Sequence, residues 1–76
     1  MSLQETQKVM SETVTKIVYW WSRPDRAWVT TARDAEGNQV GDAEYSGTRD
    51  GLDWDLKMMD RKYPNTPVEK LKPVSL

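Results

Sequence analysis

Apolar and polar residues along the chain form three segments of β character, separated by two segments of turn-forming residues. Residues 14–22, 27–34 and 39–46 are rich in β-branched and aromatic side chains, which are enriched in strands. Residues 23–26 (RPDR) and 36–38 (EGN) supply the proline, aspartate, glycine and asparagine that are typical of tight turns. Tight turns join antiparallel neighbours, so the pattern predicts a three-stranded antiparallel meander.

A helical pattern follows the third predicted strand and is expected over residues 48–63. Its apolar residues recur at i, i+4, i+7 and i+11, which is the spacing of one helix face. They are Leu52, Leu56, Met59 and Tyr63. Either Ser46 or Thr48 can cap the start, and Pro64 ends the helix because the residue before a proline is displaced from the α region. The helix is expected to pack on one face of the sheet through this stripe.

The whole chain is interpreted as one α+β domain with a β-β-β-α core over residues 14–63. Its 76 residues leave no room for a second core. Residues 1–13 are polar and are expected to form an N-terminal arm or a short helix. Residues 64–76 form a Pro-containing C-terminal tail, which has room for a short fourth strand.

The register of the second hairpin decides which side chains of the third strand face the helix. A two-residue turn at Glu36-Gly37 sets Tyr45 beside Trp28 and gives one face of mainly aromatic and small residues, which we expect to be the core. This face holds Ile17, Tyr19, Trp21, Trp28, Thr30, Ala32, Gly41, Ala43 and Tyr45. If Gly37 instead forms a one-residue bulge, the third strand shifts by one residue and its faces invert.

The composition excludes several kinds of chemistry. The chain has no cysteine and no histidine, which excludes disulfides, thiolate zinc sites and the commonest general base. No serine or threonine stands in a known nucleophile motif. We therefore expect no enzymatic activity, no catalytic residue, no cofactor and no metal site. The longest apolar run, residues 17–21, is far too short to span a bilayer, and residues 1–13 lack the apolar stretch of a secretion signal, so cytoplasmic residence is expected.

Two groups of apolar residues exceed what one sheet-on-helix core requires. Val18, Trp20 and Val29 lie on the sheet face that the predicted helix does not cover. Trp54 and Met58 lie about 200° and 240° around the helix from the first residue of the core stripe, on the outer side. Exposed apolar patches often mark association sites. We therefore expect a small protein–protein interaction module that self-associates as a homodimer or binds another protein.

Two other binding functions stay open. Basic residues alternate with tyrosine and tryptophan between positions 16 and 33, a composition that binds single-stranded nucleic acid by base stacking and phosphate contacts. The residues that would contact the nucleic acid are Lys16, Tyr19, Arg23, Arg26 and Arg33. The net charge of −1 and the acidic residues between positions 42 and 55 oppose this function because they repel phosphate. A sheet that binds a small molecule is the remaining alternative.

Overall fold

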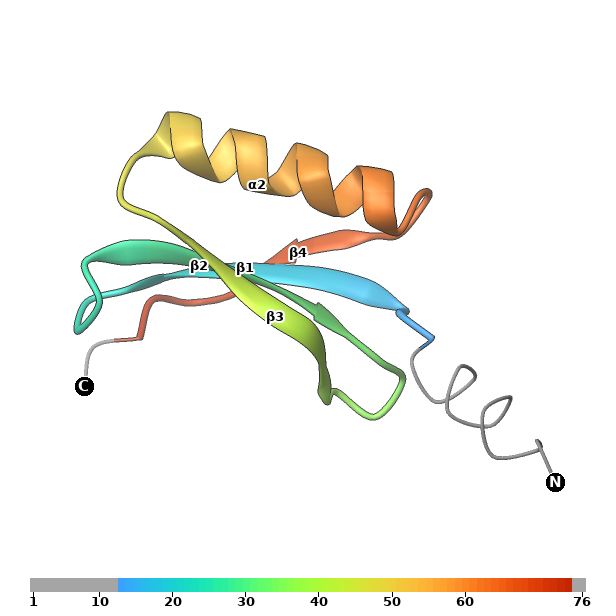
Figure 1. Cartoon of the computed structure of the whole chain (residues 1–76). Helices are drawn as coiled ribbons and strands as arrows, with labels where there is room; N and C mark the ends of the chain where they lie inside the picture. Colours follow the sequence, from blue (N-terminus) through green and yellow to red (C-terminus); the bar gives the residue numbers. More distant parts are fainter. Residues whose placement is uncertain (1–12, 75–76) are drawn as a thin grey trace, which may run out of the picture.

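The computed structural model describes residues 13–74, which form a four-stranded sheet with one helix packed against it (Figure 1). In chain order the elements are β1 (Lys16–Ser22), β2 (Ala27–Arg33), β3 (Gln39–Ser46), α2 (Arg49–Lys62) and β4 (Val68–Lys70). The arrangement confirms the predicted α+β fold and the short fourth strand. Residues 1–12, which make up nearly all of the expected N-terminal arm, lie outside the described residues, as do residues 75 and 76.

The sheet combines antiparallel and parallel pairing in the strand order β3-β2-β1-β4. The first three strands form the antiparallel meander, whereas β4 lies parallel to β1. A parallel pair needs a crossover connection. The connection from β3 to β4 contains α2, which lies along one face of the sheet against β2 and β3 before the chain turns to the opposite edge (Figure 1). The two edge strands are therefore linked through α2.

The segment after α2 follows β1 beyond the three residues of β4. The backbone N–H of Leu71 donates to the carbonyl of Tyr19 at 2.8 Å, and that of Val74 donates to the carbonyl of Trp21 at 3.0 Å. The carbonyl of Val74 accepts in turn from the N–H of Arg23 at 2.9 Å. The backbone groups on this side of β1 are thus paired almost to the β1–β2 turn.

The core lies between α2 and the sheet face beneath it. All four residues of the predicted helical stripe are buried or pack against the buried cluster: Leu52, Leu56, Met59 and Tyr63. From the sheet, Ile17 and Ala32 meet them, which confirms the face predicted for β1 and β2. Thr48 is the N-cap of α2, because its side-chain oxygen accepts from the backbone N–H of Gly51 at 3.1 Å.

The β2–β3 turn differs from the expected two-residue turn. The N–H of Asp34 donates to the carbonyl of Asn38, and the N–H of Gly37 donates to the carbonyl of Asp34, both at 3.0 Å. Three residues therefore form the loop, and Gly37 takes a φ of 86° at its last position, where a left-handed residue is required. The one-residue bulge at Gly37, which was the alternative, is the closer description.

This turn changes the register of β3, so the preferred pairing was wrong. Opposite Trp28 lies Ser46, and opposite Thr30 lies Glu44. The expected partner of Trp28 was Tyr45, whose side chain lies on the other face of β3. Tyr45, which was expected in the core, is 61% exposed as a result. An irregularity opposite Thr31, where Gly41 has a φ of 72°, separates this register from the pairing next to the turn.

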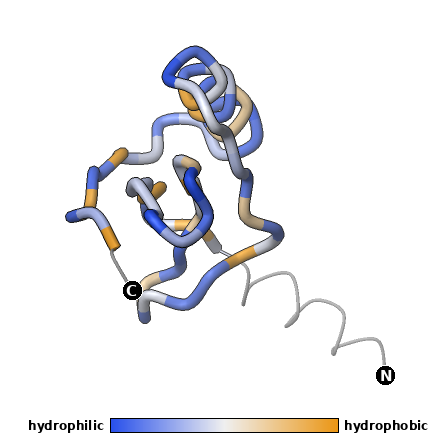
Figure 2. The backbone as a smooth tube through the Cα atoms, turned by 90° about the vertical axis from the view of Figure 1, so that its left-hand side faces the viewer, coloured by the Kyte–Doolittle hydropathy of each residue, from blue (hydrophilic) through white to orange (hydrophobic). Residues whose placement is uncertain are grey.

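The sheet face away from α2 is less exposed than the sequence indicated. Val18 and Val29 each retain only 2% exposure, and Trp20 is half-buried. The expectation considered only the cover that one helix gives to one face, but the view along the strands shows that the sheet itself is strongly curved (Figure 2). Long side chains also cover this face, since the guanidinium of Arg33 lies 5.9 Å from the Trp20 ring centroid. The two valines of the expected apolar patch are therefore buried.

Candidate functional site

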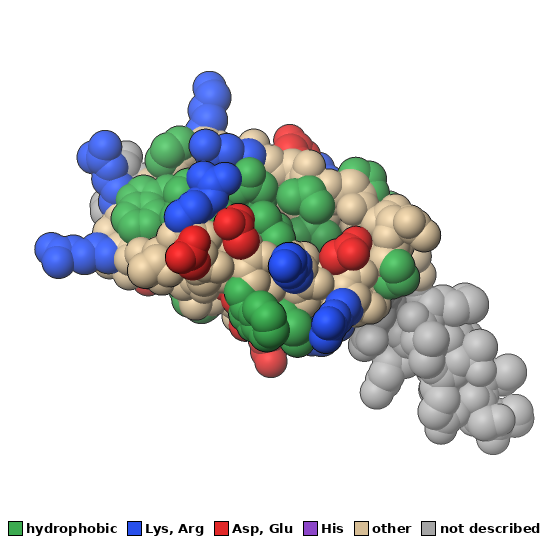
Figure 3. Space-filling view, turned by 90° about the horizontal axis from the view of Figure 1, so that it is seen from above, with side chains coloured by type: hydrophobic (Ala, Val, Ile, Leu, Met, Phe, Trp, Pro, Cys, Tyr) green, Lys and Arg blue, Asp and Glu red, His purple; other side chains and the backbone are tan. Residues whose placement is uncertain are grey.

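The outer side of α2 exposes two large apolar side chains. Trp54 is 61% exposed and Met58 is 37% exposed, while the opposite side of the helix is buried in the core. The exposure that the helical spacing predicts for this pair is observed. Figure 3 looks down on this side of the molecule, where hydrophobic side chains lie among acidic and basic ones. A tryptophan offers roughly 150–250 Å² for burial, so its exposure leaves a large apolar area uncovered.

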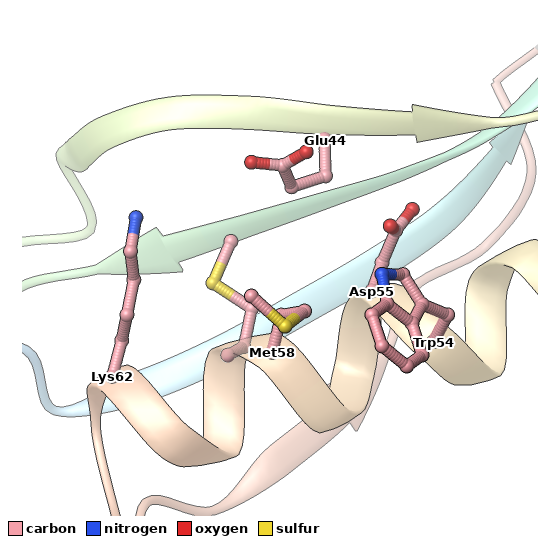
Figure 4. A pocket seen from close by; sticks show the side chains of 6 residues that line it. Glu44, Trp54, Asp55, Met58 and Lys62 are labelled. Atoms are coloured by element: carbon pink, nitrogen blue, oxygen red, sulfur yellow. The ribbon is translucent and has the colours of Figure 1, made fainter.

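Beside this pair a cleft of about 140 Å³ opens between α2 and β3, which we call the α2–β3 cleft (Figure 4). Its lining residues are Glu44 from β3 and Trp54, Asp55, Met58, Met59 and Lys62 from α2. Trp54 and Lys62 lie near its two ends, with Met58 between them (Figure 4). The cleft therefore combines an apolar wall of tryptophan and methionine with two acidic side chains and one lysine.

One of the residues that line the cleft, Asp55, is a buried carboxylate. The hydroxyl of Ser46 donates to the Asp55 carboxylate at 2.5 Å, which ties the first half of α2 to the end of β3. Sequence reasoning treated this aspartate as solvated surface. The signal that would have found it is its spacing, because Asp55 follows Leu52 by three residues and so lies at the border of the core stripe.

A second group of aromatic side chains lies at the end of the sheet where α2 begins. The Trp28 ring centroid is 6.1 Å from that of Tyr19 and 5.4 Å from that of Trp21. Two cations lie over the Trp28 ring, with Arg49 at 5.8 Å and Lys70 at 5.7 Å from its centroid. At this end of the molecule, Lys and Arg side chains surround a hydrophobic surface (Figure 3). We call these five residues the aromatic–cation cluster.

The five residues expected for nucleic-acid binding are not brought together. Lys16 is ion-paired at 3.1 Å with a glutamate of β4, and Arg33 stacks on a tryptophan of the sheet face away from α2. Tyr19 lies on the α2 side, while Arg23 and Arg26 lie in the β1–β2 turn. Sequence reasoning missed the two cations of the aromatic–cation cluster because they come from α2 and β4, which are distant in the sequence.

The described residues contain few features that identify a class of ligand. Within residues 13–74, no group of three or more acidic side chains converges in the way that metal ligands do. No helix in that same range is both long enough and apolar enough to cross a bilayer. No protein-family model matches the chain, and neither a curated protein nor a solved structure matches it. Function is therefore inferred from the surface of α2 and the cleft beside it.

Proposed function

We propose that this domain is a non-enzymatic protein–protein interaction module that binds its partner through Trp54, Met58 and the α2–β3 cleft. The observation that carries the proposal is the 61% exposure of Trp54 at the end of a cleft. Tryptophan is among the residues most enriched at the energetic centres of protein interfaces, and methionine adapts its shape to a partner. Residence in the cytoplasm, expected from the sequence, stays a prediction.

The size of the cleft favours a protein partner over a small molecule. Pockets for small molecules occupy roughly 300–1,000 Å³, whereas this cleft holds about 140 Å³. A cavity of about 150 Å³ accommodates one benzene molecule, which is comparable with one apolar side chain. A protein partner could therefore bury Trp54 and fill the α2–β3 cleft with one of its own side chains.

A photo-crosslinking experiment tests the proposal with a partner of any identity. A photoreactive phenylalanine analogue replaces Arg61, which lies beside Trp54 and Met58 on α2, and cells producing the full chain are irradiated. A discrete protein adduct is expected, and Trp54→Ser should abolish it. Tyr45→Ser is the matched control, because Tyr45 is as exposed as Trp54 but lies on the other face of the sheet. An adduct that persists in Trp54→Ser, or the absence of any discrete adduct, would contradict the proposal.

The aromatic–cation cluster supports a second candidate function, which is binding of single-stranded nucleic acid. Stacking on aromatic rings together with Arg and Lys contacts to phosphate is the chemistry of such sites. Arg49 and Lys70, which lie over Trp28, supply the cations. Both cations are engaged with the ring, and Arg49 is also 3.7 Å from Asp53, so this candidate ranks below the first.

Titration of tryptophan fluorescence with oligothymidylate tests this second candidate. If the cluster binds the oligonucleotide, the double variant Arg49→Ala/Lys70→Ala should weaken binding and flatten its dependence on salt. Arg33→Ala is the control, since that side chain lies on the opposite face of the sheet. No binding by the wild type at low salt would rule the candidate out.

A further inference from the structure

We infer that the partner of this surface is a second copy of the chain, docked so that the two α2 helices lie antiparallel across a two-fold axis between Trp54 and Met58. The inference rests on the proposed function and adds the identity and geometry of the partner. Four residues carry it, spaced four apart on one ridge of α2: Asp50, Trp54, Met58 and Lys62. We call them the α2 ridge.

The α2 ridge is complementary to itself when it is reversed. In an antiparallel pair centred at position 56, Trp54 meets the second copy's Met58, and Met58 meets the second copy's Trp54. At the ends of the contact, Asp50 meets the second copy's Lys62, and the reverse pair forms symmetrically. Each copy thus offers one acid, one aromatic ring, one thioether and one amine, and each finds a matching group. Sulfur–aromatic contacts of this kind are favourable.

Charge along α2 selects the antiparallel orientation. The helix has an acidic first turn and a basic last turn. A parallel pair would set Asp50 against Asp50 and Lys62 against Lys62, whereas the antiparallel pair sets unlike charges together. It also opposes the two helix dipoles, which is favourable. All four ridge side chains are exposed, and within residues 13–74 neither Asp50 nor Lys62 has an ion-pair partner.

The alternative route to a dimer, strand pairing at the free edge of β3, is disfavoured by the structure. The strand breaks its regular pairing near Gly41 and carries the acidic residues Asp42 and Glu44. An antiparallel β3 pair would bring these carboxylates of the two copies close together. Irregular and charged edge strands resist edge-to-edge association. Self-association is therefore assigned to α2.

The dimer is expected to be weak, because one helix face per copy covers less than a standard interface. A dissociation constant on the order of 10–100 μM follows from a contact built on one tryptophan and one methionine per copy. Sedimentation equilibrium of the full chain at protein concentrations bracketing this range measures it. Trp54→Ser should raise the dissociation constant by roughly tenfold or more. Tyr45→Ser should leave it unchanged.

Charge reversal tests the orientation specifically. Asp50→Lys alone, or Lys62→Asp alone, sets like charges together at both ends of the contact and should weaken each homodimer by roughly tenfold. An equimolar mixture of the two single variants should restore association as a heterodimer, because every end pair is then opposite in charge. The double variant Asp50→Lys/Lys62→Asp should also restore it. Thermal unfolding of each variant shows that it is folded.

The possible results separate this inference from the proposed function. Dimers that survive Trp54→Ser and both charge reversals would use another surface and would overturn the inference. A wild type that is monomeric well above 100 μM would overturn it as well. In that case, a crosslink from position 61 to a protein of different mass still supports the proposed function. A crosslinked adduct of twice the monomer mass, together with heterodimers in the charge-reversal mixture, supports both.

Discussion

Two adjacent threonines at the centre of β2 face opposite sides of the sheet and differ in how their hydroxyl groups are paired. Thr31 accepts a hydrogen bond from Nε of Arg33 at 3.0 Å. Thr30, which lies on the α2 side, is fully buried, and its hydroxyl has no hydrogen-bond partner among the described residues. A buried polar group without a partner destabilises the fold by about 1–3 kcal/mol.

Replacing each threonine by valine should therefore have effects of opposite sign. Thr30→Val is expected to raise the free energy of unfolding by about 1 kcal/mol, since it removes an unpaired hydroxyl and keeps the shape. Thr31→Val is expected to lower it by about 0.5–1.5 kcal/mol through loss of the bond from Arg33. Urea midpoints of the two variants measure the difference. Equal shifts in the same direction would show that the hydroxyl of Thr30 is paired.

Gly51 illustrates a residue whose role the sequence concealed. In the sequence it is an interior weak point of the helix, where alanine would be better by about 1 kcal/mol. In the structure a Cβ at this position would lie 2.9 Å from both Cβ and Oγ of Ser46, and 3.3 Å from Oγ1 of Thr48. The glycine allows the first turn of α2 to approach the end of β3.

Gly51→Ala should therefore destabilise the domain by about 1–3 kcal/mol, the usual effect of overpacking, and not stabilise it. Ser46→Gly removes the side chain that would clash and serves as the background for a double-mutant cycle. In that background Gly51→Ala should be nearly neutral or stabilising. Thermal or urea unfolding of the four proteins provides the cycle. If Gly51→Ala were stabilising in the wild-type background, the close approach to Ser46 would be wrong.

Among the elements, the β2–β3 loop depends on the charge of one carboxylate. Oδ1 of Asp34 accepts from the backbone N–H of Asn38 at 2.9 Å and from that of Glu36 at 3.0 Å. The bond from Asn38 is the main cause that lowers the pKa of Asp34 below its ordinary value of 3.8, with a smaller contribution from the bond from Glu36. These bonds hold the loop in the shape that sets the register of β3.

A lowered pKa in the folded state means that the ionised Asp34 stabilises the fold above pH 3.8, the ordinary value. This stabilisation is lost as the pH falls through the lower folded value. Asp34→Asn should therefore be less stable than the wild type at neutral pH, and the difference should shrink progressively below about pH 4. Urea unfolding of both proteins from neutral pH to about pH 2 measures this difference. A difference independent of pH would contradict the role of the charge.

The elements that sequence reasoning predicted correctly are those determined by local patterns. The α2 stripe from Leu52 to Tyr63 repeats with the helical period, so both the core side and the exposed side of the helix followed from spacing alone. The register of β3 did not follow, because it depends on whether Gly37 ends a two-residue or a three-residue loop. Both loops tolerate glycine, and one residue of difference inverts the faces of the strand.

The candidate site was predictable to the same extent. Exposure of Trp54 and Met58 is a property of the helix, and it was predicted correctly. Burial of Val18 and Val29 depends on the curvature of the sheet, which no local pattern reports. The α2–β3 cleft likewise depends on the register of β3, because the expected two-residue turn would have turned Glu44 away from α2.

At the scale of the whole molecule, the sheet is completed by residues far apart in the sequence. Ile17 is paired with Val68, and Ser22 forms an isolated bridge with Val74. These contacts place the end of the described chain beside its first strand. Pairing β4 with β1 closes the long stretch of chain between them, and this closure costs conformational entropy. Pairing of β4 is therefore expected to follow formation of the meander and α2, whose contacts are more local.

The parallel pairing of β1 with the tail has a mechanical consequence. The two segments run in the same direction, so a force that pulls the start of β1 away from Val74 shears them along their length. All the hydrogen bonds between them then bear the load together. Pulling instead at Lys16 and Arg33, which are paired at one end of the β1–β2 hairpin, would break its bonds one after another. In single-molecule force measurements the first geometry should therefore resist a markedly higher force, and a domain joined to others through both ends would remain folded under tension.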